Sequence, residues 1–247
     1  MRFDIMTLFP DYCNIILSES IIGKARENGY IEVYTHDIRA FAGNKHNRID
    51  DTPYGGGMGM LMQAPPIYDC YRSIVEEQPK ELHRRVIYLS PQGTVFTQKK
   101  AEELAGYDDL VLLCGHYEGV DQRVLDAIVD EEISIGDFVL TGGELPACMI
   151  VDAVSRLCDG VLSDTVCYED ESISSGLLEY PQYTRPAEFL GQGVPEVLLT
   201  GHHENIDRWR LEQSLEKTKQ RRPDLYEAYL KEHPDVLDPR KKKGVSR

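Results

Sequence analysis

Two glycine-rich stretches indicate the fold of this chain: SIGDFVLTGGELPA at residues 134–147, and CGHYEGVDQRV at residues 114–124. Each follows a short apolar run, at residues 133–135 and 110–113, and each precedes a segment with a helical pattern. Both therefore lie at the carboxyl ends of predicted strands, which is where open α/β sheets bind their ligands. Glycine lets a ligand approach the main chain closely. We expect the two loops to lie side by side, where they would form one pocket.

Residues 1–160 alternate short apolar runs with helical segments, which is typical of a mainly parallel α/β sheet. The predicted strands are 3–7, 31–35, 86–89, 110–113 and 132–135. The predicted helices are 97–105, 120–129 and 144–157. Residues 161–175 are polar and aperiodic, and we predict a mobile linker or lid there. Residues 176–247 are predicted to form a small helical domain, with Pro223 in the first turn of a new helix.

The charge of the chain is unevenly distributed. The net charge is −15, but residues 1–200 hold 15 basic and 33 acidic residues, whereas residues 201–247 hold 12 and 9. The carboxyl-terminal part could therefore attract a polyanion that the rest repels. Arg210, Lys217 and Arg221 share one helical face by their spacing and could follow phosphates, although a solvated face has the same pattern.

Composition excludes several classes of protein. Hydrophobic residues make up 41% of the chain, which suffices for a globular core. No apolar stretch is long enough for a membrane span, and the amino terminus lacks the pattern of a signal peptide. The six cysteines show no zinc-ligand spacing and are expected to be reduced, mostly buried thiols of a cytoplasmic protein.

Further motifs follow in order along the chain. They are MRFDIMTLFP at 1–10, RIDDTPYGGGMGM at 48–60, YLSPQG at 88–93, DAVSR at 152–156, GLLEYPQYTRP at 176–186 and RWRLEQSL at 208–215. Together with the two glycine-rich loops, these motifs closely resemble the bacterial tRNA (guanine-N1) methyltransferases of the SPOUT superfamily. The resemblance covers residues 1 to about 222 and implies a deep trefoil knot in the sheet domain, which periodicity alone cannot indicate.

The resemblance also implies a site for S-adenosylmethionine within the knot. Carried over residue by residue, the cofactor-binding positions are Tyr88, Leu89, Ser90, Pro91, Gly115, Tyr117, Glu118, Gly119, Ile135, Gly136, Asp137, Phe138, Val139, Leu140, Gly142, Gly143 and Pro146. Tyr117 and Phe138 could equally be ordinary core residues. His116 stands where the usual family loop has arginine, so the role of this side chain is open.

The loop at residues 48–60 could be a phosphate-binding loop, but it lacks the ending of a P-loop and the spacing of a dinucleotide site. The resemblance instead implies contact with the target guanosine. Candidate contacts are Asp50, Tyr54, Gly55, Gly57 and Gly59, while a purely structural hinge is the alternative for the glycines.

Methylation at N1 of guanine requires removal of the N1 proton by a base and stabilisation of the charge that develops at O6. The resemblance implies that Arg156 stabilises this charge, with a structural ion pair as the alternative. The family's aspartate aligns with Glu171, and Asp170 stands one position earlier. Either could be the base, or the acidic linker could have no catalytic role.

The predicted function is therefore methyl transfer from S-adenosylmethionine to N1 of the guanosine immediately 3′ of a tRNA anticodon. The resemblance further implies a homodimer with its active site across the interface, and dependence on Mg²⁺. No carboxylate cluster has a decisive ligand spacing, so no metal ligands are predicted. The alternatives are a SPOUT methyltransferase for another RNA position, a noncatalytic RNA-binding protein, or a nucleotide hydrolase.

Overall fold

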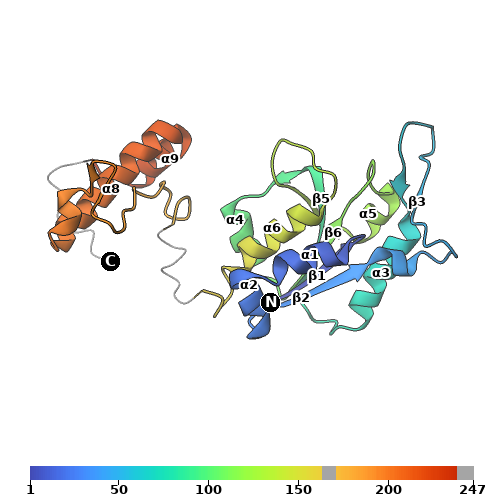
Figure 1. Cartoon of the computed structure of the whole chain (residues 1–247). Helices are drawn as coiled ribbons and strands as arrows, with labels where there is room; N and C mark the ends of the chain where they lie inside the picture. The colour runs from blue at the N-terminus through green and yellow to red at the C-terminus, as the bar shows by residue number, and fades with distance from the viewer. Residues whose placement is uncertain (163–170, 238–247) are drawn as a thin grey trace. The chain divides into compact units, whose positions relative to one another are not determined.

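The computed structural model describes residues 1–162 and 171–237 (Figure 1). The chain divides into two compact units, Met1–Asp164 and Thr165–Arg247. Asp170, one of the two candidate bases, lies outside the described residues, as do Cys167 and the lysines at 241–243.

A five-stranded parallel sheet forms the centre of the first unit (Figure 1). In spatial order its strands are β2 (Glu32–Asp37), β1 (Arg2–Thr7), β6 (Asp109–Cys114), β5 (Arg84–Val95) and β7 (Glu131–Ser134). The predicted parallel α/β sheet is thereby confirmed, and each predicted strand overlaps an observed one. The order was not predicted: β5 lies between β6 and β7, which follow it in the chain.

Helices cover both faces of this sheet. One apolar core is shared with α1 (Pro10–Leu17), α2 (Ser20–Glu27), α4 (Gln98–Leu104) and α6 (Glu144–Ser155). The other is shared with α3 (Ala64–Glu76), α5 (Gln122–Ile128) and the 3-10 helix η1 (Ile38–Phe41). Leu110 and Leu112 of β6 belong to the first core, and Val111 and Leu113 to the second. Because both faces of β6 are buried, its sequence is an unbroken apolar run instead of an alternating one.

Strand β5 contains an irregularity next to β7. Leu89 and Thr94 both pair with Ile133, so the residues between them bulge away from the ladder. A Cβ atom at Gly93 would lie 2.4 Å from the backbone carbonyl carbon of Glu132, so glycine is needed where the chain returns to the sheet. This bulge lies within the YLSPQG motif, toward the carboxyl end of β5.

The second unit is helical only in its later part. A hairpin of β8 (Glu188–Phe189) and β9 (Gln192–Gly193) is followed by the 3-10 helix η2 (Glu196–Leu199), α8 (His203–Arg221) and α9 (Pro223–Glu232). The prediction that Pro223 begins a helix is confirmed. Of the predicted helical domain over residues 176–247, residues 176–202 contain no α-helix. Pro181, Pro186 and Pro195 interrupt this stretch, and proline removes the amide donor that a helix interior needs.

Two carboxyl groups are fully buried at neighbouring strands of the sheet. Asp4 in β1 lies 2.6 Å from the Nε of Arg2 and 2.7 Å from the Nε2 of His36, whereas Asp109 in β6 accepts a hydrogen bond from Arg84 at 2.6 Å. Burial raises the pKa of Asp109 to about 6, with Arg84 acting in the opposite direction. Burial would also raise the pKa of Asp4, but hydrogen bonds from His36 and Arg2 outweigh it and lower that pKa to about 2.

Asp109 should make stability depend on pH in a defined window. Between pH 3.8 and about 6, its carboxyl is protonated in the folded chain and ionised in the unfolded chain, so its contribution to stability falls as pH rises. We expect Asp109→Asn to flatten the free energy of unfolding across this window, as measured by urea unfolding at several pH values. Asp224→Asn, which removes an exposed carboxyl, is the control. Identical pH slopes in Asp109→Asn and the unaltered protein would contradict the assignment.

Candidate active site

Three loops of the first unit meet at the carboxyl ends of adjacent strands. Loop 1 (residues 88–93) belongs to β5, loop 2 (residues 114–119) follows β6, and loop 3 (residues 134–146) follows β7 and leads into α6. The strands β6, β5 and β7 are parallel neighbours. Their three loops therefore emerge side by side at the carboxyl ends of the strands. The prediction that the two glycine-rich stretches follow the carboxyl ends of strands is therefore confirmed, and the order of the strands places loop 1 beside them.

Loops 2 and 3 are in direct contact. The amide of Gly143 donates to the carbonyl oxygen of Gly115 at 3.0 Å, and a Cβ at Gly143 would lie 2.7 Å from the Cα of Cys114. A Cβ at Gly115 would in turn lie 2.8 Å from the ring of Tyr88 in loop 1. These glycines thus allow three backbone segments to pack closely. They are not needed for a positive φ angle, which in these two loops occurs at Tyr117, Gly119 and Gly136.

The predicted cofactor residues fall into two groups, one buried where the loops leave the strands and one exposed at the loop tips. Tyr88, Leu89 and Ser90 are buried, whereas the apolar tip of loop 3 is exposed at Phe138 (53%), Val139 (82%) and Leu140. Tyr117, at the tip of loop 2, is also half exposed. Because Phe138 and Tyr117 are exposed, their interpretation as core residues is wrong. Exposed apolar side chains beside glycine-rich loops are suited to cover the flat face of a ring ligand.

The remaining predicted cofactor positions follow the same division. Gly115, Gly143 and Pro146 are buried, whereas Pro91, Glu118 and Asp137 are exposed, and Gly119, Ile135, Gly136 and Gly142 are intermediate.

Polar groups are buried beneath loop 3. Glu144 in the first turn of α6 is 5% exposed and accepts a hydrogen bond from the hydroxyl of Thr7 in β1 at 2.8 Å. Cys114 is fully buried, and burial raises the pKa of its thiol well above the ordinary value. A thiol held in its neutral form is a poor nucleophile, so we assign Cys114 a packing role where loop 2 leaves β6.

The glycine-rich segment at residues 48–60 is joined to loop 2. It begins in a small antiparallel pair, β3 (Asp50–Asp51) with β4 (Leu61–Met62). The amide of Glu118 donates to the carbonyl oxygen of Met60 at 3.0 Å, and the amide of Met62 donates to that of Gly119 at 2.9 Å. This pairing connects the predicted nucleoside loop with the predicted cofactor loop, and sequence analysis missed it because no local pattern signals it.

The predicted nucleoside contacts differ in their surroundings. Asp50 is partly buried in β3, whereas Tyr54 is 99% exposed. Gly55, Gly57 and Gly59 all have positive φ angles, which favour glycine. A Cβ at Gly59 would also meet the side chain of Glu118 at 2.3 Å. The glycines therefore have a structural requirement of their own, and contact with a nucleoside stays a prediction.

Arg156 and Glu171 belong to different units of the chain. Arg156 caps the carboxyl end of α6 in the first unit. Glu171 opens a tight turn of the second unit, in which its carbonyl oxygen accepts from the hydroxyl of Ser175 at 3.2 Å. Ile173 in this turn has a φ of +81°, which is unfavourable for a β-branched residue. Such strain is found at functional turns and motivates a test of the neighbouring carboxylate.

Two of the three predicted phosphate contacts are engaged within the second unit. The guanidinium of Arg210 lies 4.9 Å from the ring centroid of Tyr180, and Lys217 Nζ donates to the carbonyl oxygen of Glu179 at 2.7 Å. Both therefore hold the GLLEYPQYTRP segment against α8. Arg221 is exposed on the last turn of the same helix. The structure thus gives Arg210 and Lys217 a packing role that their spacing did not indicate.

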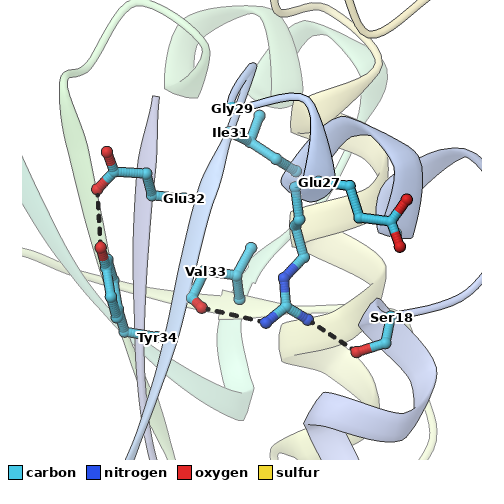
Figure 2. A pocket seen from close by; sticks show the side chains of 9 residues that line it. Ser18, Glu27, Gly29, Ile31, Glu32, Val33 and Tyr34 are labelled. Carbon is cyan, nitrogen blue, oxygen red and sulfur yellow. Dashed lines mark hydrogen bonds between the residues drawn. The ribbon is translucent and has the colours of Figure 1, made fainter.

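Figure 2 shows a shallow hollow of about 420 Å³ that lies elsewhere, beside the edge strand β2. Arg26 donates hydrogen bonds to the carbonyl oxygens of Leu17 and Val33 and to the hydroxyl of Ser18. Figure 2 draws the bonds that reach Val33 and Ser18. Because β2 and β7 lie at opposite edges of the sheet, this hollow is separate from the three loops. With its guanidinium already bound to the protein, Arg26 has a structural role.

The described residues hold neither a metal-ion cluster nor a membrane-spanning helix. Among residues 1–162 and 171–237, no group of three or more histidine, cysteine or carboxylate side chains is arranged to hold a metal ion. Within the same ranges, no helix combines the length and the apolar character needed to cross a membrane. The five described cysteines are free thiols, of which four are buried, as predicted.

Comparison with known proteins identifies the family. Residues 1–228 match the family described as tRNA (Guanine-1)-methyltransferase TrmD. A tRNA (guanine-N(1)-)-methyltransferase of Lachnospira eligens is 57% identical over 95% of this chain and 99% of its own length. Proteins with the same name from Ruminiclostridium cellulolyticum and Clostridioides difficile are 55% and 53% identical, each over 92% of this chain and 96% and 97% of their own lengths. The chain therefore belongs to the tRNA (Guanine-1)-methyltransferase TrmD family.

Proposed function

We propose that this protein transfers the methyl group of S-adenosylmethionine to N1 of the guanosine immediately 3′ of the anticodon in tRNA. The observation that carries the proposal is that three loops meet at the carboxyl ends of adjacent strands. The family match of the chain spans residues 1–228. The relatives bear the name of this activity over nearly their whole length.

The loops fit the proposed cofactor. A Cβ at Gly142 or Gly143 would lie within 3 Å of other protein atoms, so only glycine lets loop 3 pack this closely against loop 2. We propose that this close-packed junction is the cradle that receives the cofactor. The exposed apolar tip at Phe138 and Leu140 can cover an adenine, while buried Tyr88 and Gly115 form the floor. When bound, S-adenosylmethionine supplies a methyl group activated by its sulfonium. The protein residues hold and orient the reactants and exclude water.

The chemistry on the guanine is assigned to two side chains. N1 is a weak nucleophile until its proton leaves, so we propose Glu171, with Asp170 as the alternative, as the general base. Arg156 is proposed to stabilise the negative charge that develops at O6 as the proton leaves. Asp50, Tyr54 and the glycines of the 48–60 loop are proposed to hold the guanosine, because this loop is hydrogen-bonded to loop 2.

The proposed organisation of the chain follows the family. Residues 1–160 would form the knotted cofactor domain, residues 161–175 the linker and residues 176–247 the tRNA-binding domain. The position of β5 between β6 and β7, with loop 3 returning to contact loop 2, supports a threaded arrangement of this region. We further propose that the protein acts in the cytoplasm.

Homodimerisation is part of the proposal. Helix α1 exposes Tyr12, Ile15 and Ile16, and the adjacent helix α6 exposes Leu145 and Met149. Ile15 and Ile16 follow Tyr12 by three and four positions, and Met149 follows Leu145 by four, so each helix presents its set on one face. Neighbouring exposed apolar stripes are typical of surfaces that another protein covers, and a second copy of this chain is the proposed partner.

The described residues do not fit a dedicated magnesium site. Mg²⁺ prefers oxygen ligands in octahedral geometry, and no suitable cluster exists among residues 1–162 and 171–237. We therefore assign no step of the reaction to a metal held by these side chains.

Contact with tRNA phosphates should depend on Arg221 more directly than on Lys217. We expect Arg221→Gln to reduce the slope of log tRNA affinity against log salt concentration by about 1, the effect of one lost phosphate contact. Arg221 is exposed and so can reach a phosphate. Lys217→Gln should instead lower the melting temperature, because it breaks the hydrogen bond to Glu179. Binding titrations at several salt concentrations and thermal unfolding separate the two effects. The assignment is wrong if Lys217→Gln changes the salt slope without changing stability.

A transfer assay tests the function against its alternatives. The protein is incubated with methyl-labelled S-adenosylmethionine and tRNA transcripts, one of which carries adenosine in place of the target guanosine. Label that disappears with this substitution supports the proposal, and label that persists indicates another RNA position. Binding of tRNA without label indicates a noncatalytic RNA-binding protein, and hydrolysis of a nucleotide without label indicates a hydrolase.

A further inference from the structure

One ring nitrogen at the junction of loops 2 and 3 is buried and unpaired. Within the described ranges, Nδ1 of His116 has no hydrogen-bond partner and almost no accessible surface. Buried polar side-chain atoms nearly always have a partner, so an exception calls for a physical explanation. His116 directly follows Gly115, whose carbonyl oxygen accepts the bond from Gly143. The unpaired atom therefore stands beside the predicted cofactor cradle.

The carboxylate of Glu144 lies close to this nitrogen across Gly142. The position that a Cβ at Gly142 would occupy is 2.5 Å from His116 Nδ1 and 2.4 Å from Glu144 Oε2. Both atoms therefore lie near the same point above the glycine, but no hydrogen bond joins them. The other oxygen of Glu144, Oε1, is already held by the hydroxyl of Thr7 at 2.8 Å.

Two aromatic rings pack against the ring of His116. Phe9 packs edge-on against the ring with centroids 5.2 Å apart, and Tyr117 does so at 5.5 Å. The amide of Phe9 donates to the hydroxyl of Thr7 at 2.9 Å, so Phe9, Thr7 and Glu144 form one chain of contacts under loop 2. A hydrogen bond from His116 to Glu144 would extend this series of contacts, so that it links β1, α6 and loop 2.

We propose that His116 is a positioning residue of the cofactor site, which donates from Nδ1 to Glu144 Oε2 when the cofactor is bound. This bond fixes loop 2 to the first turn of α6 and holds Gly115, Gly142 and Gly143 in the arrangement that receives the ligand. A preorganised site binds more tightly because less ordering is required on binding. The inference rests on the proposed function, since it assigns the cradle to S-adenosylmethionine.

Two substitutions separate the two ring nitrogens. The side-chain amide of asparagine can take the place of Nδ1, whereas the longer glutamine places its amide nearer to Nε2. We expect His116→Asn to keep the affinity for S-adenosylmethionine within a few-fold. His116→Gln should lose about tenfold or more, the scale of one hydrogen bond to a charged group. If the effect acts through the carboxylate, the difference between these two variants should largely disappear in a Glu144→Gln background.

Nuclear magnetic resonance of the ¹⁵N-labelled histidine rings supplies a readout that a packing role would not change. In the unaltered protein saturated with cofactor, we expect a proton on Nδ1 of His116, and an Nδ1 without a proton overturns the inference. Equal affinity in the asparagine and glutamine variants, or the reverse order, also overturns it. If the unaltered protein does not bind S-adenosylmethionine, the proposed function itself fails and this inference with it, whereas normal binding in both variants contradicts only the role of His116.

Discussion

Glu171→Gln should lower the single-turnover rate of methyl transfer by about 10² to 10⁴, the usual contribution of a positioned general base. Glutamine keeps the size and hydrogen-bonding shape of the side chain but cannot accept the N1 proton. Because the loss falls on the chemical step, the affinities for tRNA and cofactor should change little. Rapid-quench measurement with saturating enzyme and both substrates gives the rate directly, and binding titrations give the affinities.

Asp170→Asn is the matched control for this experiment, since it changes the preceding acid in the same way. A severe loss at Asp170 with a mild one at Glu171 would mean that the linker aligns with the family one residue earlier. If both variants keep the normal rate while Arg156→Ala is severely impaired, the linker does not remove the proton. Another carboxylate or water would then have to be the base.

Gly142→Val should weaken the binding of S-adenosylmethionine by about 10- to 100-fold, the scale of overpacking a filled site. A Cβ there would lie within 2.5 Å of both His116 and Glu144, so these side chains must move into the cradle or the ligand must give way. The fold should survive, because both obstructing groups are side-chain ends. Calorimetric titration gives the affinity, and thermal unfolding reports the fold.

Two other glycines calibrate the effect of Gly142→Val. Gly193 has open space around its Cβ position, so Gly193→Val should leave cofactor affinity unchanged. Gly143→Ala meets the backbone of Cys114 at 2.7 Å and should destabilise the first unit itself. Normal affinity in a folded Gly142→Val protein would show that loop 3 does not hold the cofactor.

The sequence predicted the sheet well because burial leaves a local pattern. The apolar run at residues 110–113 marks a strand covered on both faces, and the loops after it follow from its end. The order of strands could not be predicted, since periodicity reports burial and not which strand is the neighbour. The bulge between Leu89 and Thr94, which shapes loop 1, depends on pairing with β7 and has no local signal.

Side-chain roles in the site were predictable only where the family motif supplied them. The spacing of Arg210, Lys217 and Arg221 indicates a shared face, but not that two of these cations hold residues 179–180. The helical pattern of residues 203–232 does not extend to residues 176–202, where Pro181, Pro186 and Pro195 interrupt the chain. The contact of Gly59 with Glu118 joins residues far apart in the chain and could be found only in three dimensions.

Mapping the methyl group on the product tRNA tests the central claim most directly. Nuclease digestion and mass spectrometry locate the modified nucleoside, and reverse transcription reports whether its Watson–Crick edge is blocked, as a methyl group at N1 requires. The account predicts 1-methylguanosine at the position immediately 3′ of the anticodon, with reverse transcription stopping there. A methyl group on another nucleotide, or on a ring atom that leaves base pairing intact, would contradict it.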